Sequence, residues 1–156
     1  MKRKGFAALA ALSFAIFQLN AQELKTTQWT AYGVSFKAPS DIHVEDDSEE
    51  SYTVYNDTYY ITVQMLAGEG IKRSELATEL KHIATEDEVT EQTPVKTFEL
   101  PHFYGVQLQG QCESDRCIYS YLLARDGGSG FYVSIVYKQK EDPNPELILR
   151  SFTLEE

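Results

Sequence analysis

Apolar and polar residues alternate along most of the chain, which is the pattern of half-buried β-strands. In the segment 59–67, for example, Ile61, Val63 and Met65 alternate with polar neighbours. Gly, Pro, Asn and Asp residues, which favour turns, separate such segments. The pattern predicts strands at residues 29–37, 42–45, 51–56, 59–67, 94–100, 103–112, 117–125 and 131–138, with a loose polar segment at 22–28 and an exposed acidic loop at 45–50.

Two other segments, residues 74–85 and 145–152, have the features of helices. In the first, Ser74 is the expected N-cap, and apolar residues recur every three or four positions. In the second, Asn144 is the expected cap and Pro145 occupies the first helical position. Each apolar stripe needs a surface to cover, so both helices are expected to pack on the strands.

These elements together predict an α+β fold in a single domain. The centre of the predicted fold is an antiparallel β-sheet with a meander at about residues 103–138. A central helix at about residues 74–85 and a C-terminal helix at about residues 145–152 flank the sheet.

The two cysteines, Cys112 and Cys117, end one predicted strand and begin the next. If residues 113–116 form the hairpin loop, the cysteines face each other across its mouth at the spacing that a disulfide requires. A metal or redox pair is the alternative, but two sulfurs do not complete a zinc site, and the spacing is not that of a C-x-x-C redox motif. We predict a structural disulfide that fixes the hairpin.

Pairing the cysteines also predicts the register of the meander. The predicted apolar face has two rows, one of Val106, Leu123 and Val133 and one of Leu108, Tyr121 and Ile135.

The beginning of the chain has the pattern of an export signal. Residues 2–4 are basic, residues 5–17 are apolar, and a small residue, Ala21, follows a short polar stretch. We predict a signal peptide at residues 1–21 and a mature domain at residues 22–156. A retained membrane anchor is the alternative, although the apolar run is shorter than the roughly 20 residues of a spanning helix. Export predicts a secreted or periplasmic protein without stable membrane insertion after cleavage, in a compartment that suits a disulfide.

Composition and net charge limit the classes of molecule that the protein is expected to bind. The chain has 156 residues, of which 42% are hydrophobic and 12% aromatic, enough to bury a core. Its formal net charge is −10, which repels phosphate backbones and anionic membrane surfaces. We therefore expect no nucleic-acid partner.

The order of elements resembles the PsbP-like superfamily, which includes photosystem extrinsic subunits, Ran-binding nuclear import factors and small secreted bacterial proteins of the DcrB type. The segments that carry the resemblance are GVSFKAPSDIHV at 33–44, YYITVQML at 59–66, SELATELKHIA at 74–84 and PELILRSF at 145–152. The resemblance implies an antiparallel sheet flanked by helices and a noncatalytic role in binding or assembly. No binding residue of the family can be assigned to a position in this sequence. A cystatin-like α+β fold is the alternative architecture.

The sequence contains few residues in the patterns of catalytic or metal-binding motifs. The three histidines, His43, His82 and His102, fall in different elements without the spacing of a metal site. Ser129 lies in a glycine-rich turn, not in the G-x-S-x-G order of a nucleophile elbow. We therefore predict no catalytic residue, no cofactor site and no metal site.

Two alternatives stay open. A small secreted hydrolase would combine His102 or His43 with a carboxylate from a distant segment. A calcium-binding module would use the carboxylates of residues 45–50, although that loop lacks the order of an EF-hand.

Tyrosines are the remaining candidates. Several fall on the less apolar side of their strands, and tyrosine suits interfaces because a large ring carries a polar tip. We take Tyr60, Tyr104 and Tyr132 as a possible interaction surface. The function that these features favour is a secreted, soluble, noncatalytic binding or assembly accessory protein of the bacterial cell envelope, with a protein partner there.

Overall fold

The computed structural model describes residues 23–66 and 72–155, which form ten strands and three helical segments. The strands are β1 (Leu24–Trp29), β2 (Val34–Pro39), β3 (His43–Asp47), β4 (Ser51–Tyr55), β5 (Tyr59–Met65), β6 (Lys96–Glu99), β7 (Phe103–Cys112), β8 (Asp115–Ala124), β9 (Gly130–Tyr137) and β10 (Thr153–Leu154). The helical segments are the 3₁₀ turn η1 (Arg73–Glu75) and the α-helices α2 (Leu76–Glu86) and α3 (Asn144–Arg150).

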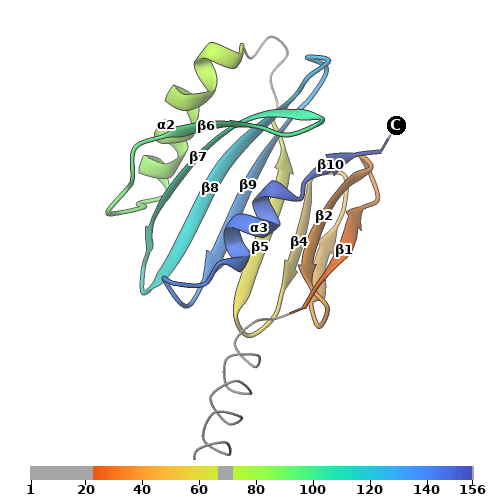
Figure 1. The fold of residues 1–156 in the computed structure, drawn as a ribbon, viewed down its shortest axis with the longest axis vertical. Helices are drawn as coiled ribbons and strands as arrows, with labels where there is room; N and C mark the ends of the chain where they lie inside the picture. The colour runs from red at the N-terminus through yellow and green to blue at the C-terminus, as the bar shows by residue number, and fades with distance from the viewer. Residues whose placement is uncertain (1–22, 67–71, 156) are drawn as a thin grey trace, which may run out of the picture.

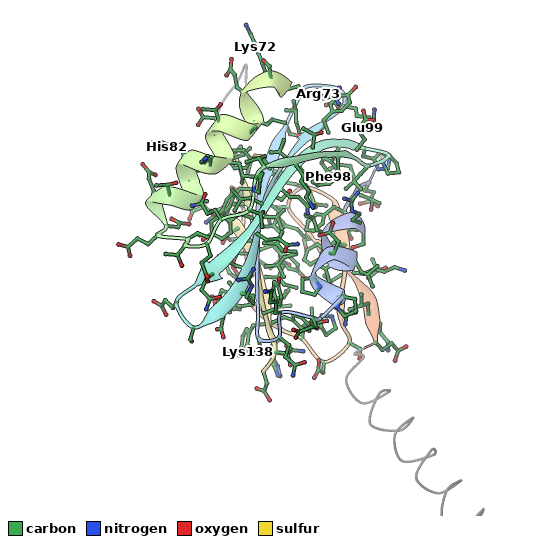
Figure 2. All side chains as sticks on the ribbon, turned by 60° about the vertical axis from the view of Figure 1, so that its left-hand side comes forward. Lys72, Arg73, His82, Phe98, Glu99 and Lys138 are labelled. Atoms are coloured by element: carbon green, nitrogen blue, oxygen red, sulfur yellow. A yellow bond between two sulfur atoms is a disulfide. The ribbon has the colours of Figure 1, made fainter. Side chains whose placement is uncertain are left out.

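Two antiparallel sheets organise these elements. The large sheet has seven strands in the order β3-β4-β5-β9-β8-β7-β6, and the small one has the order β1-β2-β10. Figure 1 shows the small sheet and α3 on one side of the large sheet, with α2 near β6 and β7. Figure 2 shows α2 and α3 on opposite sides of the strands. The predicted α+β class is therefore confirmed.

The larger core lies between the large sheet, the small sheet and α3. Trp29 of β1 is fully buried there, and its indole N–H donates to the Ser48 carbonyl at 2.6 Å. The rings of Phe36 and Phe152 stack with centroids 4.5 Å apart. These contacts fasten the small sheet to one face of the large sheet.

The smaller core lies on the opposite face, beneath α2. Leu76 and Leu80 of α2 are buried against a cluster of tyrosines on β8 and β9. The ring of Tyr132 contacts those of Tyr119 and Tyr121 edge-on, at centroid distances of 5.5 and 5.7 Å. Both faces of the central strands are thus covered, which is why these strands are apolar on both sides.

The predicted disulfide between Cys112 and Cys117 is present, but the hairpin register is not the predicted one. Cys112 lies opposite Asp115, and Cys117 lies opposite Gly110, so the disulfide runs diagonally with Cα atoms 6.0 Å apart. The displacement is two residues, and an even displacement leaves every side chain on its predicted face.

The predicted register between the next two strands is wrong by three residues. Val133 pairs with Ser120 rather than with Leu123, and Ile135 pairs with Ile118. An odd displacement turns a strand over, so Val133 and Ile135 face the larger core instead of α2. Alternation cannot set the register here because both faces of β9 are apolar.

The N-terminal part also differs from the prediction. The segment predicted to be loose contains β1, and the predicted strand at 29–37 is split by a turn between Trp29 and Val34. The acidic segment predicted as a loop forms β3 up to Asp47 and then a turn. These strands are polar because they lie at the edges of their sheets and most of their residues are exposed to solvent.

Both helices are close to their predicted positions. The first begins with η1 instead of a cap by Ser74, and its N-terminus has no side-chain capping bond. The second ends at Arg150, and the chain continues into β10, which pairs with β2. The buried ring of Phe152 redirects the chain toward the small sheet at this point.

The predicted signal peptide at residues 1–21 lies outside the described residues and stays a prediction. In residues 23–66 and 72–155, each helix is too short or too polar to span a membrane.

The disulfide generates one prediction. Replacing both cysteines, C112S/C117S, should lower the free energy of unfolding by only about 2 kcal/mol, because the closed loop is short. The strand pairing around it should keep the hairpin in place. Chemical denaturation of the oxidised protein and the double variant measures the difference, and loss of the folded state in the variant would show that the disulfide holds the whole fold.

The buried tyrosines generate a second prediction, which concerns the pH dependence of stability. Burial, followed by the bond to Asp87, raises the pKa of Tyr119 to about 12; burial also raises the pKa of Tyr121 to about 12 and that of Tyr132 further. A raised pKa favours the neutral phenol in the folded state, so the stabilisation is complete below pH 10 and is lost as the pH rises from about 10 to 12. Phenolate absorbance and thermal unfolding between pH 8 and 12 should change together; ionisation of all tyrosines near pH 10 without unfolding would contradict this.

Candidate functional site

The face of the large sheet that α2 covers continues beyond the helix. Tyr60 of β5 lies opposite Val136 of β9, which lies opposite Cys117 of β8. Cys117 belongs to the buried cluster under α2, so the Tyr60 side chain is on the same face as the helix. Because α2 contacts β7 and β8, the strands β3, β4 and β5 present this face without a helix on it. Figure 1 shows β4 and β5 well away from α2.

Three rings line up across this open face, one from each of its strands. The rings of His43 and Tyr55 are 5.5 Å apart between centroids, and those of Tyr55 and Tyr60 are stacked 6.2 Å apart. Tyr55 is 37% exposed and Tyr60 is 42% exposed. We call His43, Tyr55 and Tyr60 the aromatic ladder. It is a large exposed ring surface on an otherwise well-packed molecule.

The sequence brings the ladder together through strand pairing. His43 pairs with Tyr55, and Tyr55 pairs with Tyr60. The hydroxyl of Tyr60 donates to the carboxylate of Glu45, and this bond raises the pKa of Tyr60 above its usual value. The bond fixes the direction of the Tyr60 ring, so the ladder is ordered in the absence of a partner.

Two hollows adjoin the ladder and meet at Asp115 and Val136. The first, of about 430 Å³, is lined by residues 56–60 and by Lys138. The second, of about 510 Å³, lies beside the C-terminal end of α2 and is lined by four carboxylates, those of Asp87, Glu88, Glu113 and Asp115. We call these four residues and the hollow they line the acidic groove.

The bonds within the acidic groove are few. The hydroxyl of Tyr119 donates to Asp87 at 2.9 Å, and Lys138 pairs with Asp115 at 3.3 Å on the exposed surface. The remaining carboxylates of Glu88 and Glu113 have no ion pair with any residue in the described part of the chain. The groove is therefore strongly negative and open to solvent.

The three tyrosines predicted as an interaction surface have different surroundings. Tyr60 belongs to the aromatic ladder. The guanidinium groups of Arg73 and Arg125 lie 3.9 and 4.6 Å from the ring centroid of Tyr104, which is half-buried. Tyr132 is only 8% exposed beneath α2, so its expected contribution to an exposed surface is corrected. The structure therefore does not bring the three together.

The arginines around Tyr104 have a structural role. Glu99 pairs with Arg73 at 3.3 Å and approaches Arg125 at 3.9 Å, which holds the start of η1 and α2 against β6 and β7. Figure 2 shows Arg73 and Glu99 close together at this end of the helix. The Tyr104 ring therefore already has two guanidinium groups as cation–π neighbours.

The residues of the two alternative predictions are dispersed. His43 lies in β3, His82 pairs with Glu86 on the exposed side of α2, and His102 accepts the Leu154 N–H at 3.3 Å. In the acidic segment 45–50, Asp46 accepts a bond from Ser51, and Asp47 accepts one from Thr30 at 2.8 Å. Among residues 23–66 and 72–155, no group of three or more His, Cys, Asp or Glu is placed to hold a metal ion.

Sequence reasoning missed the acidic groove. Its residues come from two distant segments, 87–88 and 113–115, which an isolated bridge between Thr90 and Gln111 holds side by side. The runs of acidic residues were visible, but nothing local indicated that they meet. His43 was missed as a ladder member for the same reason, since its place depends on pairing with β4.

Solved structures similar to this chain include Ran-binding proteins. The Ran-binding protein Mog1p of Saccharomyces cerevisiae matches with a TM-score of 0.58 and 7% identity, over 86% of this chain and 96% of its own. A single-residue mutant of Mog1 matches with a TM-score of 0.56 and 8% identity, over 85% and 96%. At such identity the likeness shows a shared fold. No curated protein matches the chain by sequence.

These neighbours overturn two predictions. The resemblance to small secreted proteins of the DcrB type is wrong, because the similar structures are those of Mog1, a Ran-binding protein, and Ran-binding import factors are another member of the superfamily that the sequence resembles. The predicted role as an accessory protein of the bacterial cell envelope is wrong for the same reason. The weak motifs behind the resemblance occur in many α+β domains and did not distinguish among them.

A family model matches the greater part of the chain, from residue 40 to residue 142. The matched region runs from β3 to β9 and therefore contains the aromatic ladder, α2 and the acidic groove. By this match the chain belongs to the dihydro-orotase-like family.

Proposed function

We propose that this chain is a protein-binding domain whose partner docks on the open half of the large sheet, with Tyr55 and Tyr60 at the centre of the contact. The observation that carries the proposal is the aromatic ladder, an ordered row of exposed rings on a sheet face that no helix of the described chain covers. Buried tyrosines contribute disproportionately to the binding energy of protein interfaces.

The surroundings of the ladder support the same role. The polar rim comes from Glu45 and from the acidic groove on the other side. An apolar centre with a charged rim is the usual anatomy of a protein interface.

The fold agrees with a binding role. Mog1p is described as a Ran-binding protein, so a scaffold of this shape serves protein recognition in another chain. The family carries the name of an enzyme, but the described histidines lie apart, in β3, in α2 and in the turn before β7. A binding role uses the exposed ladder, whereas a catalytic role leaves it unexplained.

The proposal predicts that a crosslinker at position 60 captures the partner. Tyr60 is replaced by the photoreactive amino acid p-benzoylphenylalanine in cells, and Leu147 of α3, which is 55% exposed on the other side of the molecule, is the matched control position. The same protein should be captured reproducibly from position 60 and not from position 147. Equal capture from both positions, or from neither, would contradict the proposal.

The purified partner then gives a quantitative prediction. The variant Y55A/Y60A should bind about tenfold more weakly or worse, because two rings leave the centre of the contact. Its melting temperature should change little, since both rings are exposed. The variant Y60F keeps the ring and loses the bond to Glu45, so it should keep most of the affinity. Unchanged affinity of Y55A/Y60A in calorimetry would refute the role of the ladder.

A further inference from the structure

The open sheet face around the aromatic ladder has a one-sided distribution of charge. Glu45 lies against the hydroxyl of Tyr60 at one edge of the ladder. At the other edge, the described residues that line the two hollows provide five carboxylates and one ammonium group. The carboxylates belong to Asp57, Asp87, Glu88, Glu113 and Asp115, and the ammonium group to Lys138. The rings are thus surrounded by predominantly negative charge.

Some of the charges in this rim have internal partners, and two carboxylates are available to a binding partner. Lys138 pairs with Asp115, and Asp87 accepts the neutral phenol of Tyr119. Glu88 and Glu113 are exposed to solvent, and neither has a cationic neighbour in the described chain. A cationic ligand would therefore meet carboxylates that no internal ion pair competes for.

The end of α2 makes this rim more negative. A helix C-terminus carries a partial negative charge and usually has Lys, Arg or His nearby. Here Glu86 is the last helical residue, Asp87 is the C-cap, and Glu88 follows it. The helix dipole therefore adds to the negative potential on this side of the ladder.

The rim is also fixed in position. The disulfide of Cys112 and Cys117 holds the hairpin that carries Glu113. The bridge between Thr90 and Gln111, with N–H···O distances of 3.0 and 2.8 Å, ties that hairpin to the segment after α2. The groove and the ladder therefore form one preformed surface, and a single extended segment can contact both.

We propose that the partner segment that covers the aromatic ladder is rich in arginine or lysine and extends from the ladder into the acidic groove, an inference that rests on the proposed function. The charge complementarity of the rim carries it. Guanidinium and ammonium groups pair with the carboxylates of Glu88 and Glu113, and a further cation stacks on the rings of Tyr60 and Tyr55. Complementary charge gives such a complex a fast, salt-sensitive association.

The backbone of the two glutamates provides an unusually clean test variant. Glu88 has a φ of 61° and Glu113 a φ of 56°, both in the left-handed region that glycine prefers. Replacing both by glycine removes two charges and relieves the backbone at the same time. The variant E88G/E113G should therefore melt a few degrees higher than the parent, and lost binding would not come from unfolding.

The test uses a fluorescein-labelled 12-residue peptide of alternating arginine and glycine as the probe, with alternating glutamate and glycine as the negative control. Fluorescence anisotropy measures Kd for the full chain at 50 and 150 mM NaCl. Two variants are compared with E88G/E113G. The first, Y55A/Y60A, removes the ladder. The second, E49Q/E50Q, is the matched charge control, since it removes two charges from the exposed turn after β3.

The expected result is weakening by about fivefold or more for E88G/E113G and for Y55A/Y60A, and by less than about twofold for E49Q/E50Q. Parallel weakening by E88G/E113G and E49Q/E50Q would show attraction by net charge alone and overturn the inference. Absence of binding by the arginine peptide would overturn it as well. Either failure leaves the proposed function intact if the crosslinker at position 60 still captures its partner, whereas loss of that capture removes the proposed function itself.

Discussion

Burial of the large sheet on both faces is the constraint on which the rest of the structure depends. One face of β8 and β9 packs on the small sheet and α3, and the other packs on α2. A helix is about 10 Å across and strands lie about 4.8 Å apart, so a single helix covers about two strands. The small sheet covers one face broadly, but α2 leaves β3, β4 and β5 open on the other. The exposed aromatic ladder follows directly from this mismatch in width.

The acidic groove lies where α2 ends above the β7–β8 turn. The last turn of the helix and the tip of the hairpin are adjacent because α2 rests on the same strands that form the hairpin. Solvent screens the repulsion between the carboxylates, so the fold tolerates them at moderate cost. A basic segment bound across the groove and the ladder would offset this repulsion. The groove and the ladder would then act as a single binding surface.

Local structure was largely predictable, whereas register was not. The two helices, the meander and the disulfide follow from periodicity, turn residues and cysteine spacing, all of which act over a few residues. Strand β1, with the polar run Lys25 to Gln28, shows no alternation, and β10 is only two residues long, so both were missed. The predicted register of β9 was wrong because Val133 and Tyr132 are both buried, on opposite faces of the strand. Neither face of β9 therefore has the pattern of polar residues that marks a solvent-exposed side.

By itself the sequence determined the fold class, the order of most elements and the pair of cysteines that would bond. The tertiary structure alone decided which tyrosines are exposed: Tyr132 and Tyr60 occur in similar strand patterns, but α2 covers one and does not reach the other. It also decided that Glu88 and Glu113 share one groove, since they are 25 residues apart and meet only through the bridge of Thr90 with Gln111. The periodicity of apolar residues indicates whether a segment is a helix or a strand and which of its residues share a face. The exposure of a side chain, and its distance from side chains of other segments, depend on how far the neighbouring elements extend over it.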